Sequence, residues 1–188
     1  MAAMKKTALV TGASSGIGAA YARALAAQGY DLILVARRAD RLQALADEVK
    51  QAHGHRAEVL PADLLRREAP AELVAGVAAL GMQVDLLVNN AGMGVHGPFA
   101  DATAEDDLRM IDLNITSLTA LTRAFAPAMI ARRSGAIINV ASTAAFQAIP
   151  FMGVYAATKA YVLSFSEAIA EELRPHGITV QCLCPGAT

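Results

Sequence analysis

The stretch Thr11-Gly12-Ala13-Ser14-Ser15-Gly16-Ile17-Gly18 decides the fold, because an apolar run precedes it and a helical pattern follows it. Lys6–Thr11 is predicted to be a strand and Ile17–Gln28 a helix. Glycine lets a pyrophosphate approach the backbone, and a helix N-terminus offers free N–H groups and a positive dipole end. The glycine spacing is G-x-x-x-G-x-G rather than G-x-G-x-x-G, and a glycine-rich turn without a ligand is the alternative. The strand before it and the helix after it favour a phosphate-binding loop, with contacts from Gly12, Ser14, Ser15, Gly16, Ile17 and Gly18.

Beyond this loop, apolar runs alternate with amphipathic stretches along the chain. Asp31–Ala36 is an expected strand that is almost wholly apolar, as when both faces of a sheet are covered. The alternation predicts an α/β fold with a doubly wound parallel sheet, Rossmann-like, in a single dinucleotide-binding and catalytic domain over residues 1–188. In such sheets the ligand lies beyond the carboxyl ends of the strands. The other expected strands are Ala57–Pro61, Asp85–Asn89, Ala136–Ala141 and Thr179–Cys184, and the other expected helices are Asp40–Ala52, Ala71–Leu80, Ala104–Arg132 with a break near Met110–Asn114, and Tyr155–Arg174.

The composition narrows the classes of function. The 188 residues are 55% apolar and 18% charged, which suits one soluble domain with a well-filled core. A net charge of -1 argues against a nucleic-acid partner or an anionic membrane surface. Mean hydropathy is +0.38, yet no apolar run has the length of a membrane span and no signal-peptide pattern precedes the first strand. We therefore expect a cytoplasmic protein without a membrane partner.

The two cysteines, Cys182 and Cys184, lie two apart on one expected strand. That spacing makes a poor disulfide pair, and two thiols without further ligands are a weak metal site. We expect buried free thiols in a reducing compartment, and no metal.

The end of the second strand, Val35-Ala36-Arg37-Arg38, bears on the choice of cofactor. An acidic residue here would accept hydrogen bonds from the ribose hydroxyls of NAD, and Ala36 cannot do so. Arg37 and Arg38 offer planar donors suited to a 2′-phosphate. The hypothesis is NADP in preference to NAD, although NAD is possible and the two arginines could be ordinary solvated charges.

Four polar residues form a candidate catalytic set. Ser142 ends a strand, and Tyr155 and Lys159 lie one turn apart on the following helix. A phenol, with a reference pKa of ~10, is a poor base at neutral pH, and an ammonium nearby favours the phenolate. Asn114 lies in the expected helix break. Each residue alone has a structural explanation, but together, beside a dinucleotide loop, they indicate acid/base chemistry at a substrate oxygen.

These motifs resemble those of the short-chain dehydrogenase/reductase family over nearly the whole chain. The loop at 11–18 resembles its T-G-x-x-x-G-x-G motif, and Asn89-Asn90-Ala91-Gly92 its N-N-A-G motif. Asn114, Ser142, Tyr155 and Lys159 match its Asn-Ser-Tyr-Lys tetrad, with twelve residues between Ser and Tyr. The family also has counterparts of Asp63-Leu64, at its adenine-contacting acidic position, and of Pro185-Gly186, after its sixth strand.

The resemblance implies a role for each residue. Tyr155 would be the general acid/base, Lys159 would support it and hold the nicotinamide ribose, and Ser142 would orient the carbonyl. Asn114 would hold a water that links Lys159 to solvent. Asn90, Ala91 and Gly92 would line the adenine-ribose side, and the Pro185 and Gly186 backbone would meet the nicotinamide.

The resemblance also bears on assembly and completeness. Family members commonly form homodimers or homotetramers through helices that correspond to Ala104–Arg132 and Tyr155–Arg174. They usually continue past Pro-Gly with a lid, another helix and a seventh strand. Because the sequence stops at Thr188, we expect it to be a fragment that lacks the lid and the last strand.

The sequence predicts an oxidoreductase that transfers a hydride between the nicotinamide and a ketone, aldehyde or secondary alcohol. Apolar segments 143–152 and 93–99 should flank the substrate, which favours an apolar substrate, although these residues could instead be core or subunit interface. Two alternatives are a non-catalytic dinucleotide-binding sensor or scaffold, and an isomerase that returns the hydride to its substrate. The isomerase would need a larger substrate domain than this chain contains.

Overall fold

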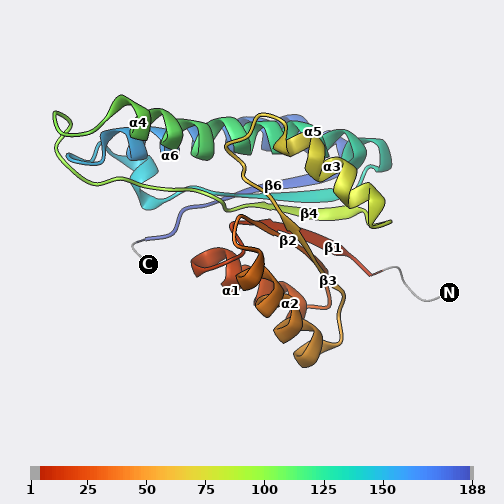
Figure 1. Cartoon of the computed structure of the whole chain (residues 1–188). Helices are drawn as coiled ribbons and strands as arrows, with labels where there is room; N and C mark the ends of the chain where they lie inside the picture. Colours follow the sequence, from red (N-terminus) through yellow and green to blue (C-terminus); the bar gives the residue numbers. More distant parts are fainter. Residues whose placement is uncertain (1–4, 187–188) are drawn as a thin grey trace.

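A six-stranded parallel sheet forms the centre of the protein, which is described here from a computed structural model over residues 5–186 (Figure 1). The strand order is β3-β2-β1-β4-β5-β6, and every neighbouring pair is parallel. This confirms the predicted doubly wound, Rossmann-like sheet. The strands are β1 (Thr7–Thr11), β2 (Asp31–Ala36), β3 (Ala57–Pro61), β4 (Val84–Asn89), β5 (Gly135–Val140) and β6 (Ile178–Leu183).

Helices cover both faces of the sheet. In Figure 1, α1 and α2 lie on one face and α3 to α6 on the other. Two apolar clusters fill the spaces between sheet and helices, so that all five residues of β1 are buried. The helices are α1 (Gly16–Ala27), α2 (Ala39–His53), α3 (Ala69–Ala79), α4 (Ala104–Ile111), α5 (Leu118–Arg132) and α6 (Gly153–Leu173). Within the described residues, no helix is both long and apolar enough to cross a membrane.

The expected break near Met110–Asn114 is a π-helical segment, η1 (Asp112–Ser117), that joins α4 to α5 without interruption. The position of the irregularity was predicted, but the prediction that the helix breaks there was wrong, because the helix continues with a wider, π-helical winding. A π-helical turn adds a residue to the winding and often marks a functional site. This segment places Asn114 inside the protein, at 2% exposure. Two short 3₁₀ turns, η2 (Thr143–Phe146) and η3 (Arg174–His176), were not predicted.

The strand order reverses between β1 and β4, so the loops that follow these two strands diverge from a common point. In open α/β sheets such a point opens a crevice at the carboxyl ends of the strands. The glycine-rich loop follows β1 and the Asn-Asn-Ala-Gly segment follows β4. The fold thus places both motifs on the two sides of one crevice.

Candidate active site

The glycine loop has no room for side chains at two of its glycines. Gly12 has a φ of +66°, and a Cβ on it would lie 2.7 Å from Asn90 Nδ2. A Cβ on Gly18 would lie 2.5 Å from the same nitrogen and would overlap the Gly12 carbonyl. Gly16 has a φ of +56° and faces open space, so only its backbone conformation requires glycine. The loop is therefore closely packed at Gly12 and Gly18 and open where a phosphate would bind.

Substitution of Gly18 by Ala is expected to weaken NADPH binding by at least about tenfold and to lower stability by roughly 1–3 kcal/mol, because the loop must move off the Gly12 carbonyl. Gly153→Ala is the matched control, since a Cβ there meets nothing within 4 Å. Fluorescence titration and chemical denaturation measure the two effects. Equal NADPH affinities for the two variants would contradict the expectation.

Thr11 and Asn90 connect the loops after β1 and β4. The Thr11 hydroxyl accepts the N–H groups of Asn90 and Ala91, both at 3.0 Å. Asn90 Nδ2 donates to the Thr11 carbonyl at 2.9 Å. The Asn90 side chain therefore holds the crevice in shape, in addition to lining it.

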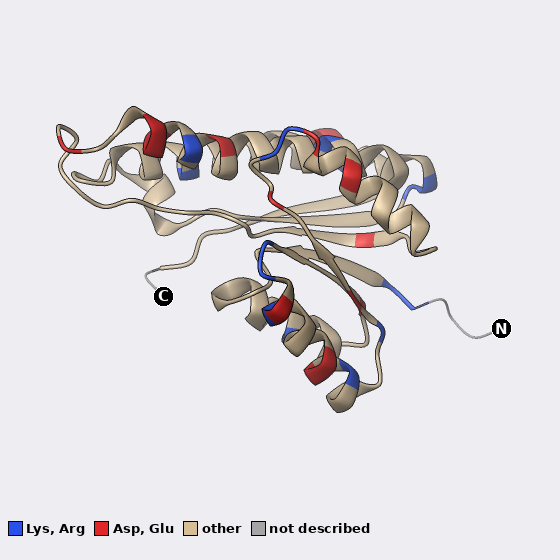
Figure 2. Cartoon of the chain, in the orientation of Figure 1, with Lys and Arg blue, Asp and Glu red and all other residues tan. Residues whose placement is uncertain are grey.

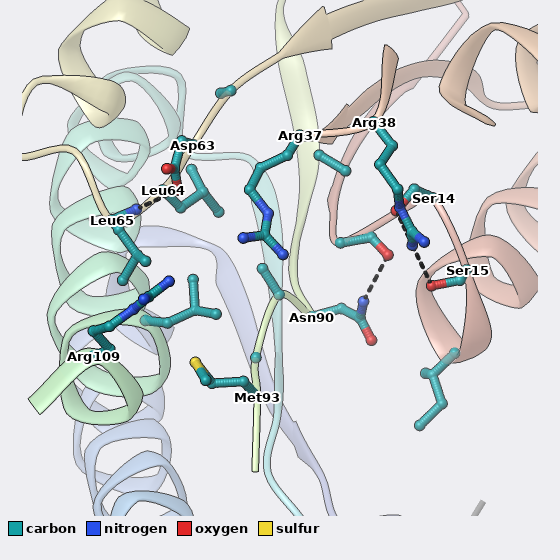
Figure 3. Close-up of a pocket in the computed structure, with 17 residues that line it drawn as sticks. Ser14, Ser15, Arg37, Arg38, Asp63, Leu64, Leu65, Asn90, Met93 and Arg109 are labelled. Carbon is teal, nitrogen blue, oxygen red and sulfur yellow. Dashed lines mark hydrogen bonds between the residues drawn. The ribbon is translucent and has the colours of Figure 1, made fainter. Parts of the chain in front are cut away.

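A cavity of about 530 Å³ gathers most of the residues predicted to contact the cofactor (Figure 3). Arg37 points into this cavity, and Arg38 Nη2 donates to the Ser14 and Ser15 hydroxyls at 2.9 and 3.0 Å. Gly16 and Gly18 are not among its lining residues. The predicted residues that line it are Gly12, Ser14, Ser15, Ile17, Arg37, Arg38, Asp63, Leu64, Asn90, Ala91 and Gly92.

A second cavity of about 530 Å³, which we call the catalytic cavity, continues from the first. The two share Ile17, Asn90, Gly92 and Met93, so they form one extended crevice. Of the residues predicted to contact substrate or nicotinamide, the catalytic cavity is lined by Ser142, Tyr155, Lys159, Pro185 and Gly186. An extended crevice with arginines at one end and a Tyr-Lys pair at the other has the shape that an extended dinucleotide requires.

Lys159 is buried beside Tyr155. The residue is 6% exposed. Its Nζ donates to the Val140 carbonyl at 2.9 Å and lies 5.7 Å from the centre of the Tyr155 ring. Burial lowers the pKa of Lys159 to about 8, because the charged ammonium loses its hydration. The ammonium therefore lies near the Tyr155 ring, and its burial costs stability. Its action on the phenol stays a prediction.

Asn114 lies behind the crevice and lines neither of its cavities. Its Nδ2 donates to the Met93 carbonyl and to the Thr158 hydroxyl, and its Oδ1 accepts the Met93 N–H. Both amide hydrogens are thus used to hold the segment after β4 against α6. The water-holding role implied by the resemblance stays a prediction, and any such water must use other atoms than these hydrogens.

Ser142 combines a structural contact with a free hydrogen. Its Oγ accepts the Ala144 N–H at 3.1 Å and so caps η2. A hydroxyl that accepts one hydrogen bond can still donate its own hydrogen. Ser142 can therefore donate to an oxygen in the catalytic cavity while the cap keeps it in place.

Three residues that shape the crevice were not predicted from the sequence. A Cβ on Gly94 would lie 3.0 Å from Tyr155 Cδ2, so this glycine lets the chain pack on the Tyr155 ring. Thr158 holds Asn114, and Arg109 of α4 lines the first cavity (Figure 3). Gly94 lies two residues after the Asn-Asn-Ala-Gly motif and could have been found from that position, whereas Thr158 and Arg109 carry no distinctive local pattern.

The two cysteines depart from the prediction of buried thiols. β6 ends at Leu183, so Cys184 lies beyond the strand, and both cysteines are partly exposed within the described residues. They are free, with their sulfurs 3.9 Å apart. Burial nevertheless raises the pKa of Cys182 to about 11, which disfavours its thiolate. Residues 5–186 offer no group of three metal-ligating side chains.

The fold and the crevice define a Rossmann-like α/β protein with a serine, a tyrosine and a lysine at one end of a dinucleotide-sized crevice. Residues 6–188 match the family model described as short chain dehydrogenase, and the chain belongs to that family.

Similar proteins extend further than this chain. A short chain dehydrogenase of Pseudocercospora fijiensis is 40% identical over 184 residues, which are 97% of this chain and 59% of that protein. The structure of a short-chain dehydrogenase from Sphingobium yanoikuyae in complex with NADPH is 44% identical, with a TM-score of 0.92 and coverage of 97% of this chain and 71% of that one. The bulky-bulky ketone specific alcohol dehydrogenase from Comamonas testosteroni is 39% identical, with a TM-score of 0.91 and coverage of 97% and 73%. The chain thus spans about three-fifths of the length of the curated relative.

Proposed function

We propose that the protein is an NADP-dependent oxidoreductase that transfers a hydride between the nicotinamide and the carbon of a ketone, aldehyde or secondary alcohol, with an apolar substrate favoured. The observation that carries this proposal is one continuous crevice with Arg37 and Arg38 at one end and Ser142, Tyr155 and Lys159 at the other. The complex of the Sphingobium yanoikuyae relative with NADPH supports the cofactor. The residues described here would act as one dinucleotide-binding and catalytic unit.

The residues present fit the cofactor. The first cavity brings the glycine loop together with two arginines, and Arg38 is hydrogen-bonded to the Ser14 and Ser15 hydroxyls of that loop. Arg37 and Arg38 would hold the 2′-phosphate, Asp63 and Leu64 the adenine, and Lys159 the nicotinamide ribose. When bound, NADPH supplies the hydride.

The protein's own residues manage the substrate oxygen and its proton. The Ser142 hydroxyl donates to the carbonyl oxygen and orients it. In reduction, the Tyr155 phenol gives its proton to that oxygen as negative charge develops there, and in oxidation it takes the proton back. The Lys159 ammonium, held by the Val140 carbonyl, stabilises the phenolate that remains.

The experiment that tests the proposal is NADPH oxidation against a panel of apolar and charged carbonyls, repeated with NADH. We expect turnover of apolar carbonyls and a higher kcat/KM with NADPH. Tight NADPH binding without turnover of any carbonyl would favour a sensor or scaffold instead. High activity on charged sugars and none on apolar carbonyls would refute the substrate class.

Substitution of both Arg37 and Arg38 by Ala is expected to lower kcat/KM with NADPH roughly 10³-fold and to leave the value with NADH unchanged. The reason is that each charge-assisted hydrogen bond to the 2′-phosphate contributes about 2 kcal/mol, and NADH has no such phosphate. Arg41→Ala is the control, since Arg41 is an exposed arginine of α2 that does not line the crevice. Equal losses with both cofactors would contradict the assignment.

The proposal extends to compartment and assembly. Two free, partly exposed thiols fit a reducing compartment, for which we propose the cytoplasm. We propose a homodimer or homotetramer through the faces of α4, α5 and α6, as the family resemblance implies. Sedimentation velocity of the purified protein measures the assembly.

A further inference from the structure

A third cavity, of about 460 Å³, adjoins the catalytic cavity, and we call it the side cavity. Its walls come from residues 95–110 and 149–155, whose loops lie at the same end of the molecule in Figure 1. Because Tyr155 lines both cavities, a carbonyl held at Tyr155 can send one substituent into the side cavity. The residues common to both are Val95, His96, Ile149, Met152 and Tyr155.

Apolar side chains form most of the side cavity, including Met110 at its base and Phe99 and Phe151 at its rim. Phe151 is 58% exposed and has a φ of +66°, which is costly for an aromatic residue. Its carbonyl accepts the Gly97 N–H at 3.0 Å, which ties the two walls together. Backbone strain of this kind concentrates at functional sites, and an exposed ring at a cavity rim is suited to contact an apolar ligand.

The charges at the side cavity all have one sign. Asp101, Asp106 and Asp107 line it, whereas none of its lining residues is a Lys or an Arg, and His96 is the other titratable group there apart from Tyr155. Asp106 has a structural reason to be present, because it bonds the Thr103 cap in the first turn of α4. Asp101 precedes the helix and has no such role. Figure 2 shows the acidic residues on this loop and at the start of α4.

We propose that the side cavity binds a large, uncharged apolar substituent of a ketone substrate, and that Asp101, Asp106 and Asp107 exclude substrates whose tail carries negative charge. The inference rests on the proposed function, because the substituent enters from a carbonyl held at Tyr155. The substrate class inferred here is narrower than the apolar carbonyls of the proposed function. Thioesters of phosphate-bearing carriers and keto acids with a distal carboxylate are poor substrates, because like charges repel at the rim.

The charge test uses methyl 4-butanoylbenzoate and 4-butanoylbenzoate, which share a ketone and differ in one distal charge. For the wild type we expect a kcat/KM at least roughly tenfold higher for the ester at low ionic strength, where surface charges are least screened. The double variant Asp101→Asn with Asp107→Asn should narrow that ratio by about fivefold, because it removes two charges and keeps side-chain size. Glu105→Gln is the control, since Glu105 lies in the same turn and does not line the cavity.

The occupancy test uses Ala102→Trp, which places a large side chain at an exposed position of the cavity wall. We expect the KM for methyl 4-butanoylbenzoate to rise about tenfold and the kcat/KM for butan-2-one, which is too short to reach the side cavity, to stay unchanged. Phe151→Ala should likewise raise the KM for methyl 4-butanoylbenzoate and leave the kcat/KM for butan-2-one unchanged. Circular dichroism and NADPH titration show that the variants are folded.

Three results would overturn the inference. The first is an equal or higher kcat/KM for 4-butanoylbenzoate or acetoacetyl-CoA than for the ester, and the second is an ester-to-carboxylate ratio that Asp101→Asn with Asp107→Asn leaves unchanged. The third is an equal loss on butan-2-one and the ester in Ala102→Trp. In all three, wild-type turnover of butan-2-one with NADPH still supports the proposed function. Failure of the proposed function is different, since no ketone would be turned over by the wild type.

Discussion

Replacing Tyr155 by Phe is expected to lower kcat about 10³-fold and to change the affinity for NADPH by less than about threefold. The ring packs against Gly94, and phenylalanine keeps that contact, so the substitution removes only the hydroxyl. General acid/base groups typically contribute factors of about 10²–10⁴ to the rate. Without the Tyr155 hydroxyl, Ser142 is the remaining hydroxyl at the substrate oxygen, and a serine hydroxyl does not replace the phenol as a proton donor. Single-turnover kinetics with NADPH measure the rate, and fluorescence titration measures the affinity.

Tyr161→Phe is the matched control. Tyr161 lies on the same helix, α6, and its hydroxyl bonds Thr119 outside the crevice. We expect its kcat to equal that of the wild type. A Tyr155→Phe enzyme that retains more than a tenth of the wild-type kcat, or that loses NADPH binding in proportion, would show that Tyr155 is not the acid/base.

Replacing Lys159 by Met is expected to abolish most turnover, by about 10²-fold or more, and yet to stabilise the fold near neutral pH by about 2 kcal/mol. Burial depresses the pKa of Lys159 from 10.5 to about 8, which corresponds to roughly 3 kcal/mol of instability at pH 7. The lost bond to the Val140 carbonyl offsets about 1 kcal/mol of this gain. Methionine fills a similar volume without a charge.

The stability difference between Lys159→Met and the wild type should depend on pH in a defined direction. Below pH 8, Lys159 is protonated in both the folded and the unfolded wild type, and the folded state bears the full cost of burial. Between pH 8 and 10.5 the unfolded wild type binds more protons than the folded one, so its free energy of unfolding rises with pH. The advantage of Lys159→Met should therefore be largest below pH 8 and should shrink towards pH 10.5.

Urea denaturation across this pH range measures the difference, with Lys50→Met, at an exposed position of α2, as the control. A Lys159→Met protein that is less stable than the wild type at pH 7, with a difference that does not vary with pH, would contradict the buried, destabilising ammonium.

The fold was predictable because β1, β2 and β4 are nearly continuous apolar runs, as strands covered on both faces must be. Gly12 and Gly18 were predicted from their place between a strand and a helix, and the structure adds a requirement for glycine there, since their backbones approach Asn90 and each other too closely for any side chain. In these cases the local sequence and the tertiary structure impose the same requirement.

Other features depend on contacts between segments that are distant in sequence, and local sequence patterns could not predict them. The winding of η1 places the Asn114 amide where it meets Met93 and Thr158, and nothing in residues 112–117 alone distinguishes a π-helical segment from a break. The partial exposure of Cys182 could not be read from the apolar pattern of its strand. The side cavity likewise forms where two segments, residues 95–110 and 149–155, meet although they are distant in sequence.

The most direct test of the central claim is to supply NADPH deuterated at both hydrogens of nicotinamide C4, together with an apolar ketone, and to analyse the alcohol by mass spectrometry. Hydride transfer in the crevice predicts an alcohol with one deuterium at the carbinol carbon, formed about 10³-fold more slowly by Tyr155→Phe than by the wild type. An alcohol without deuterium, or no alcohol from any ketone while NADPH remains bound, would contradict the claim.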